Sequence, residues 1–261
     1  MCLLVLAWQA HPRYRLVVAA NRDEYHERAA APLGRWAEPP GILAGRDLRA
    51  GGTWLGLDRA RRFGVVTNFR ELQQARPAAP SRGSLIPRFL SGAADAAGFF
   101  GELQGAAAGY SGFNLLLADG HRLWYGSNRA QPFARALPAG VYGLSNELLD
   151  TPWPKLVRVK ARFQEWLAEP AATGADLFAM LGDRTQALAA DAPPPAPGGL
   201  PREWERILSA PFVVHPIYGT RSSTVLMLEA DGAVRLAERR FDSAGAAQGE
   251  TEFRLNAADW P

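Results

Sequence analysis

The 261-residue sequence predicts an α+β fold in which sheets and helices pack as a sandwich. Short segments rich in Val and Leu, which are typical of strands, occur near both ends of the chain, and the most regular helical pattern lies between them. The strands do not alternate regularly with helices, as they would in a doubly wound parallel sheet. Hydrophobic residues make up 48% of the sequence and charged residues 21%, which is typical of a folded protein and argues against disorder.

The first two predicted strands form a hairpin. Residues 2–8 (CLLVLAW) and 15–20 (RLVVAA) are apolar, and a His-Pro pair lies between them. The polar stretch NRDE, at residues 21–24, follows directly after the second strand. The chain from there to residue 53 is rich in Pro, Gly and Arg, and is predicted to be a loop.

A second hairpin and a helical region are predicted next. Residues 54–58 (WLGLD) and 63–68 (FGVVTN) flank the basic turn RARR and have the composition of strands. Residues 84–105 have a helical pattern that Pro87 and Gly92 divide into two pieces. Three more strands are predicted, at residues 113–119, 122–128 and 140–146.

The clearest helix is predicted at residues 153–169. Pro154 suits its first turn. Apolar residues repeat at helical spacing along one face, namely Leu156, Val159, Phe163, Trp166 and Leu167. We expect this face to pack in the core rather than against a membrane or a partner. A second helix is predicted at residues 175–188.

The C-terminal part of the chain returns to strands. The segment DAPPPAPGGLP, residues 191–201, is predicted to be a stiff loop or linker outside the core. Strands are predicted after it at residues 223–229, 233–241 and 251–255. The sequence shows no internal repeat. Its length suits one large domain or two modest ones.

Composition argues against several kinds of site. Cys2 is the only cysteine, so an internal disulfide and a multi-cysteine metal site are excluded. The four histidines lack metal-binding spacing, and no metal site is expected. The net charge of +3 is a mild excess, carried by basic residues that are scattered rather than clustered, so we expect no nucleic-acid binding.

No targeting or membrane segment is predicted. The apolar run at residues 2–8 has no basic segment before it, unlike a signal peptide. No apolar stretch approaches the roughly 18 residues of a membrane span. We therefore expect a cytoplasmic protein without a transmembrane segment.

Cys2 is the first candidate functional residue. If the initiator methionine is removed, its α-amine and its thiol belong to one residue, so that a nucleophile and a base near neutral pKa come together. The alternative is that Cys2 is a small apolar residue that begins a buried strand. The sequence leaves both open.

Three further polar clusters stand at predicted strand ends. In NRDE, Asp23 is a candidate for orienting an amine and Arg22 for balancing charge near a thiolate, whereas a solvated turn is the plain alternative. Asn68 and Asn146 are candidate donors to a developing oxyanion, or caps of turns. Arg221, in TRSS at residues 220–223, is a candidate clamp for a carboxylate or phosphate, or a structural cation.

Taken together, the motifs resemble a known family. They occur in order as MCLL at the start, AANRDE at 19–24, AGRDLRAGGTWLGL at 44–57, VTNFRE at 66–71, GLSNELLDTPWPK at 143–155 and YGTRSSTVL at 218–226. This set resembles the NRDE family, also called the transport and Golgi organisation protein two family. The resemblance implies an N-terminal-nucleophile (Ntn) hydrolase fold, a four-layer αββα sandwich, as one domain over residues 1–261.

The resemblance also implies roles for single residues. The related enzymes are the choloylglycine hydrolases and penicillin V acylases, which cleave amides with an N-terminal cysteine. By position, Cys2 matches their nucleophile, Asp23 their amine-orienting aspartate, and Arg221 their late arginine, while Asn68 and Asn146 match their oxyanion-side asparagines. This sequence departs from theirs in one respect, because its arginine is adjacent to the aspartate rather than a few residues before it.

Two main functions are expected from the resemblance. The first is binding or trafficking of an amphipathic metabolite such as haem or acyl-CoA, with Asn21, Arg22, Glu24 and Arg221 as ligand-binding residues. The second is an N-terminal cysteine hydrolase or acyltransferase that acts on an acyl amide or a thioester. No cofactor is required in either case, and haem is a candidate ligand rather than a catalyst. A third reading is an interaction module in which the motifs serve only folding.

Overall fold

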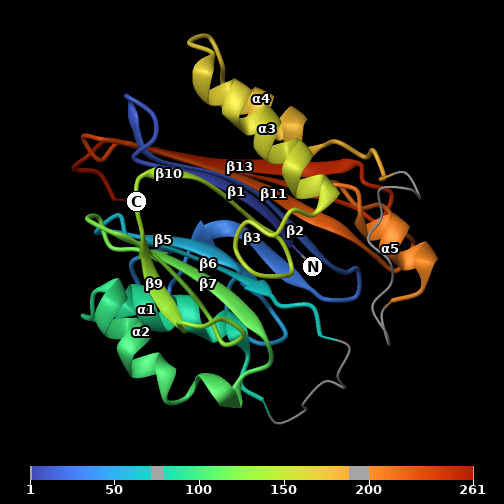
Figure 1. Ribbon diagram of the computed structural model, residues 1–261. Coiled ribbons are helices and arrows are strands. Elements are labelled where there is room, and N and C mark those ends of the chain that lie inside the picture. Colours follow the sequence, from blue (N-terminus) through green and yellow to red (C-terminus); the bar gives the residue numbers. More distant parts are fainter. Residues whose placement is uncertain (1, 72–78, 188–199, 261) are drawn as a thin grey trace. The chain divides into compact units, whose positions relative to one another are not determined.

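The computed structural model describes residues 2–71, 79–187 and 200–260 (Figure 1). For Cys2 it describes the backbone alone. Its described part is mostly sheet with shorter helices, which confirms the α+β class. Most of the predicted Pro-rich loop at residues 191–201 lies outside the described residues.

The chain divides into two compact units built from interleaved segments. The first unit contains Met1–Glu27, Gly140–Ser145 and Asp150–Arg254. The second contains Arg28–Ala139, Asn146–Leu149 and Leu255–Pro261. The expectation of one domain over residues 1–261 stays a prediction.

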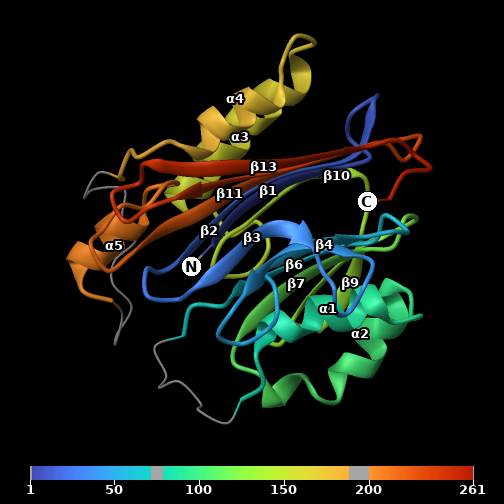
Figure 2. The ribbon, with the colours of Figure 1, turned by 180° about the vertical axis from the view of Figure 1, so that it is seen from behind.

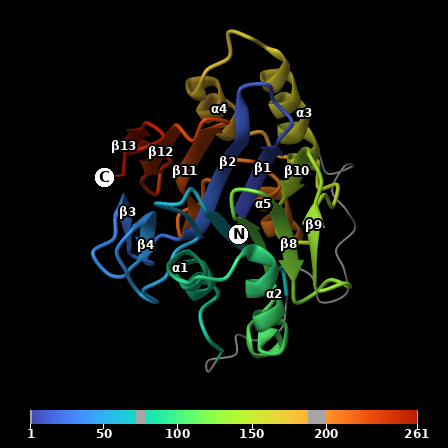
Figure 3. The ribbon, with the colours of Figure 1, turned by 90° about the vertical axis from the view of Figure 1, so that its left-hand side faces the viewer.

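The first unit is built on a six-stranded sheet with the order β10-β1-β2-β11-β12-β13, which Figure 3 shows from one side. Its strands are β1 (Cys2–Trp8), β2 (Tyr14–Tyr25), β10 (Gly140–Leu144), β11 (Tyr218–Glu229), β12 (Val234–Phe241) and β13 (Ala247–Leu255). The two longest strands, β2 and β11, pair with each other antiparallel at the centre. Strand β1 pairs antiparallel with the other side of β2.

Helices α3 (Pro154–Ala168) and α4 (Gly174–Leu181) pack on one face of this sheet (Figure 2). Alternate residues of the strands, such as Val5 and Val17, join Leu156 and Phe163 in one core cluster. The predicted apolar face of the helix at 153–169 is thereby confirmed as core. A short helix, α5 (Arg202–Leu208), also belongs to this unit.

The second unit is built on a seven-stranded sheet with the order β3-β4-β5-β6-β7-β8-β9. Its strands are β3 (Ala30–Arg35), β4 (Ile42–Asp47), β5 (Leu55–Asp58), β6 (Phe63–Asn68), β7 (Phe113–Ala118), β8 (Leu123–Ser127) and β9 (Ala134–Leu137). Helices α1 (Leu85–Ser91) and α2 (Ala96–Gln104) pack on it through Ile86, Phe89 and Phe100. Two short 3-10 turns, η1 (Arg82–Ser84) and η2 (Ala107–Gly109), flank these helices. Each unit therefore combines one sheet layer with one helix layer.

Two elements lie where the sequence predicted a loop. Strands β3 and β4 occupy part of the segment between NRDE and residue 53, so that prediction is wrong. Strand β3 contains Pro32 and Gly34, which weaken the strand signal, and its register with β4 shifts between Ala31 and Gly34. As an edge strand it tolerates a proline, because one side of its backbone needs no partner in the sheet.

NRDE and TRSS were expected just outside the strands, but both lie within strands. NRDE is inside β2 and TRSS is inside β11. Polar residues in a sequence resemble a turn, but here each strand continues because the neighbouring strands supply backbone partners for it. The helix predicted at residues 175–188 also differs, since α4 ends at Leu181 with Gly182 as its C-cap.

Helix α3 approaches the sheet closely at a glycine. A Cβ atom built on Gly143, in β10, would lie 2.7 Å from Cδ1 of Leu156. Leu156 is buried in the core of the first unit, so it has little room to move. The absence of a side chain at Gly143 is therefore a packing requirement.

We expect Gly143→Ala to lower the free energy of unfolding by about 1–3 kcal/mol, because the added methyl group overlaps Leu156. Gly101→Ala in α2 is a matched control, since its added carbon meets open space and should raise stability by up to about 1 kcal/mol. Urea unfolding followed by circular dichroism measures both. Equal effects of the two substitutions would contradict the close approach.

Candidate functional site

Sheet register brings three sequence motifs together in the first unit. Cys2, the first residue of β1, is in register with Arg22 of β2. Arg22 is in turn in register with Ser222 of β11. Asp23, the next residue of β2, is in register with Thr220. The start of the chain, NRDE and TRSS therefore meet at one end of one sheet, although the last two are about 200 residues apart in sequence.

A β-bulge at Arg221 shapes this end of the sheet. The register of β11 against β2 shifts between Thr220 and Ser222, which leaves Arg221 without an opposing residue. Its guanidinium Nη1 donates to the backbone oxygens of Tyr25 (3.3 Å) and His26 (2.6 Å). Arg221 thus holds the end of β2 in place, which is the structural role considered for it above.

Asp23 is a buried carboxyl group in a polar frame. Its side chain is 2% exposed, and the Thr220 hydroxyl donates to its Oδ1 at 2.7 Å. Thr220 Oγ1 also accepts a bond from the N–H of Val213 (2.9 Å), so the hydroxyl is oriented toward the carboxylate. The Tyr218 hydroxyl donates to the backbone oxygen of Asp23 at 3.0 Å. Asp23 is therefore held rigidly through both its side chain and its backbone.

Burial raises the pKa of the Asp23 carboxyl above its ordinary value, because the charged form loses its hydration. The positive charge of Lys155, the Thr220 hydroxyl and the positive charge of Arg22 oppose this rise in pKa. Lys155 lies in the first turn of α3 and is itself only 3% exposed. The electrostatics of Asp23 therefore depend on a buried cation from the helix layer.

Lys155 and Thr220 belong to the site, but the sequence motifs do not single out either residue. Thr220 is part of the TRSS cluster. Lys155 had a readable signal, because Lys155, Val159 and Phe163 are four residues apart and form one helical stripe. A charged residue in an apolar stripe indicates a buried partner.

Asn21 ties the helix layer to the sheet. Its Nδ2 donates to the backbone oxygens of Leu181 and Pro211, both at 2.9 Å. Its Oδ1 accepts a bond from the Ser223 hydroxyl at 2.6 Å. These bonds give Asn21 a structural role, and its part in ligand binding stays a prediction.

Arg22 and Glu24 lie on the sheet face opposite to Asn21 and Asp23, because side chains alternate along a strand. Arg22 is 7% exposed, and its Nη2 lies 4.0 Å from Glu24 Oε2. Burial and the positive charge of Arg22 both lower the pKa of Arg221, while Glu24 opposes this. The positive charges of Arg22 and Arg221 therefore disfavour each other at this end of the sheet.

Exposed apolar side chains lie at the end of β2 that Arg221 contacts. Tyr25 and Ile217 are 51% and 56% exposed, and together we call them the Tyr25 surface. Tyr25 supplies a backbone oxygen to Arg221, and the N–H of His26 donates to the backbone oxygen of Ile217. Because side chains alternate along β2, the Tyr25 ring lies on the face of Asn21 and Asp23, whereas Arg221 reaches the backbone beside it.

Asn68 and Asn146 lie in the second unit and contact each other. Asn68 ends β6, as predicted, and its backbone oxygen accepts a bond from Asn146 Nδ2 at 3.0 Å. The N–H of Arg70 donates to the backbone oxygen of Asn146 at 2.6 Å. Asn114, buried in β7, donates to the backbone oxygen of Glu147 at 2.9 Å. The segment that carries Asn146 is thus fixed, and the oxyanion role of both asparagines stays a prediction.

The described residues contain neither a membrane span of helical type nor a clustered metal site. No helix among them is both long and apolar enough to cross a membrane. In the same part of the chain, no cluster of three or more His, Cys, Asp or Glu side chains is arranged to hold a metal ion.

Comparison with known proteins identifies the family. The family model described as Transport and Golgi organisation 2 matches residues 1–243. The chain belongs to the Transport and Golgi organisation 2 family. This confirms the resemblance found from the motifs.

Mammalian members of the Transport and Golgi organisation 2 family align over almost the whole chain. The Mus musculus homolog is 33% identical over 277 residues, which cover 98% of this chain and 100% of that protein. The homologs from Bos taurus and Homo sapiens are 35% and 34% identical, with the same coverage. Among solved structures, the Caenorhabditis elegans N-acylethanolamine-hydrolyzing acid amidase ortholog has a TM-score of 0.41 and 12% identity, covering 86% of this chain and 92% of that one.

The raised pKa of Asp23 predicts a pH dependence of stability. Above the ordinary carboxyl pKa of 3.8, the folded protein keeps a proton that the unfolded chain has lost. The free energy of unfolding of the wild type should therefore fall as pH rises from about 4 through the folded-state pKa of Asp23. Asp23→Asn has no proton to lose, so its stability relative to the wild type should increase over that range.

Urea unfolding of the wild type and of Asp23→Asn at several pH values measures this difference. Glu203→Gln, at an exposed position in α5, serves as the control and should change little with pH. A difference between Asp23→Asn and the wild type that does not vary with pH would contradict the raised pKa.

Proposed function

We propose that this member of the Transport and Golgi organisation 2 family binds an amphipathic anion, with haem and acyl-CoA as the candidate ligands. The proposal rests on one observation: the buried Arg22, which is in register with Cys2, and the bulged Arg221 both lie at the same end of the β2–β11 pair. The Tyr25 surface lies at the end of β2 that Arg221 contacts, and it suits the apolar part of such a ligand.

The positive charges of Arg22 and Arg221 favour an anionic ligand. Burying a guanidinium group is unfavourable unless an anion lies near it. The Glu24 carboxylate raises the pKa of Arg221, which opposes the effects of burial and of Arg22. A carboxylate or phosphate group from a ligand would supply the further negative charge. Arginine suits both groups, because its planar donors can bind two oxygens at once.

The Tyr25 surface favours a ligand with an apolar part. Large exposed apolar residues in one place favour binding of an apolar partner. Tyr25 is partly ordered by an edge-on contact with Tyr218, whose ring centre lies 5.2 Å away. In this proposal an acyl chain or a porphyrin lies against the Tyr25 surface, and its anionic group reaches Arg221, whose Nη1 contacts the backbone oxygen of Tyr25. An amphipathic ligand satisfies both features at once.

We expect Arg22→Gln and Arg221→Gln each to weaken binding of haemin or palmitoyl-CoA by about tenfold or more, because each removes a charge-assisted bond. Arg254→Gln is the control, since that side chain is 72% exposed in the same unit. Fluorescence titration measures affinity, and circular dichroism checks that each variant folds. Affinity no better than about 1 mM for both ligands, or equal weakening by Arg254→Gln, would refute the proposal.

Acyl transfer by Cys2 is the second candidate function. It is favoured by the placement of Asp23, which follows the register partner of Cys2 and is oriented by Thr220. In this reaction the thiolate attacks the carbonyl carbon of an amide or thioester, and the amine or thiol leaves with a proton. Water then releases the acyl group from the sulfur. The reaction requires a free α-amine, and hence removal of the methionine before Cys2.

We expect intact-mass analysis of the purified protein to find a chain that begins at Cys2 if acyl transfer is the function. Exposure to a p-nitrophenyl acyl ester should then add one acyl mass, and Cys2→Ala should abolish the adduct because no nucleophile remains. Cys2→Ser is a second variant that keeps the size of the residue. A retained methionine, or an adduct that persists in Cys2→Ala, would exclude this function and leave the binding proposal intact.

A further inference from the structure

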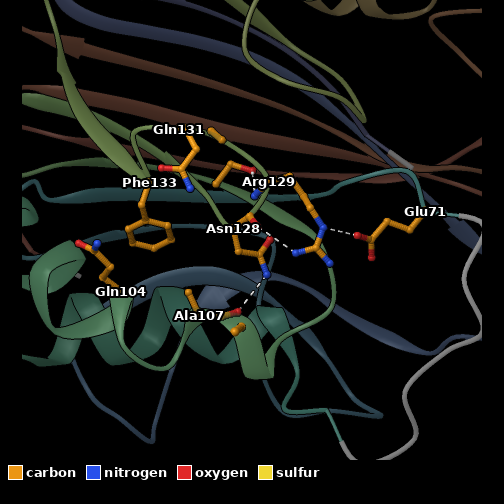
Figure 4. A pocket seen from close by; sticks show the side chains of 10 residues that line it. Glu71, Gln104, Ala107, Asn128, Arg129, Gln131 and Phe133 are labelled. Carbon is orange, nitrogen blue, oxygen red and sulfur yellow. Dashed lines mark hydrogen bonds and ion pairs between the residues drawn. The ribbon is translucent and has the colours of Figure 1, made fainter.

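The second unit contains a pocket that none of the predicted site residues lines. Its volume is about 550 Å³, which lies within the usual range for small-molecule sites. Figure 4 shows it between the end of α2, the η2 turn and the segment that follows β8. The pocket lies wholly within the second unit, so it is independent of the proposed function.

The floor of this pocket is held rigidly by Asn128. Its Nδ2 donates to the backbone oxygens of Ala107 (3.0 Å) and Tyr110 (3.2 Å), and its Oδ1 accepts a bond from the N–H of Phe113 (2.9 Å). These bonds join the η2 turn, β7 and the segment after β8. A site whose frame is already fixed loses little conformational entropy when a ligand binds.

One wall of the pocket contains an ion pair between Arg129 and Glu71. The Nε of Arg129 donates to Glu71, and its Nη1 donates to the backbone oxygen of Asn128 at 2.9 Å. Glu71 also accepts a bond from the N–H of Gly112 at 3.1 Å. Because the guanidinium charge is already balanced, this wall does not strongly favour an anion.

The opposite part of the pocket is aromatic and amide-bearing. Phe133 lies there with Gln104 and Gln131 on either side (Figure 4). Its contacts with Phe100 and Phe113 are both edge-to-face, at ring-centre distances of 6.0 and 6.5 Å. Neither glutamine side chain forms a hydrogen bond with another described residue, and both residues are exposed.

We propose that this pocket binds the adenine base of a nucleoside. A glutamine amide offers one donor and one acceptor, which matches the N6 and N7 atoms of adenine. An aromatic side chain supplies the surface on which a base stacks. Phe133 between two amides with open hydrogen-bonding capacity provides both kinds of contact.

The same geometry predicts how the ligand is selected. The base and not the phosphate carries recognition, because Glu71 already pairs with Arg129. Adenosine and adenosine monophosphate should therefore bind with similar affinity, within about threefold. A site built for phosphate would instead bind the monophosphate much more tightly.

Isothermal titration calorimetry of the full-length chain with adenosine, adenosine monophosphate and glucose tests the proposal. We expect adenosine to bind with a Kd below about 1 mM, and glucose not to bind. Gln104→Ala and Gln131→Ala should each weaken adenosine binding by about fivefold or more, because each removes contacts to the base edge. Gln164→Ala, at an exposed position of α3, is the matched control and should have no effect.

The stacking contact needs a separate variant, because Phe133 also packs against other rings. Phe133→Leu keeps an apolar side chain there while removing the aromatic face, and should weaken binding by about tenfold. Thermal unfolding shows whether this variant folds. The proposal is overturned if adenosine does not bind below about 1 mM, if the glutamine variants bind it normally, or if glucose binds in its place.

Discussion

The pairing of β2 with β1 on one side and β11 on the other is the constraint on which the candidate site depends. A strand has a side-chain period of two, so a slip of one residue would exchange the faces of Arg22 and Asp23. The buried carboxyl would then leave its Thr220 partner, and the guanidinium group would enter the layer beneath α3 and α4. The register of β2 therefore decides which charged side chain faces the helices and which faces the other side of the sheet.

Two features hold this register. Along most of its length β2 is apolar on both faces, and Val17 and Ala19 pack into the core cluster that includes α3 and α4. At its end the bulge at Arg221 absorbs one residue of β11, so that Thr220 and Ser222 both find partners on β2. Apolar packing thus fixes the strand, and the bulge adapts its polar end to the site.

The two candidate functions share one set of groups and differ in what is required of residue 2. Binding of an amphipathic anion needs Arg22, Arg221 and the Tyr25 surface, whatever precedes Cys2. Acyl transfer needs in addition a free α-amine and the frame around Asp23. Burying the Asp23 carboxyl and the Lys155 ammonium group costs hydration free energy. Removing either residue would leave the other buried without its opposite charge. Membership of the Transport and Golgi organisation 2 family is compatible with either function.

The sequence by itself determined the local elements and the family. Short apolar runs predicted the β1–β2 hairpin, β5 and β6, and a helical period predicted α3, because these signals come from residues close together in the chain. The motifs NRDE and YGTRSS identified the family. Only the tertiary structure decided that Cys2, Arg22 and Ser222 are in register, that Lys155 is buried near Asp23, and that β3 is an edge strand. The physical reason is that pairing across about 200 residues depends on which surfaces fit together, and no local pattern records that choice.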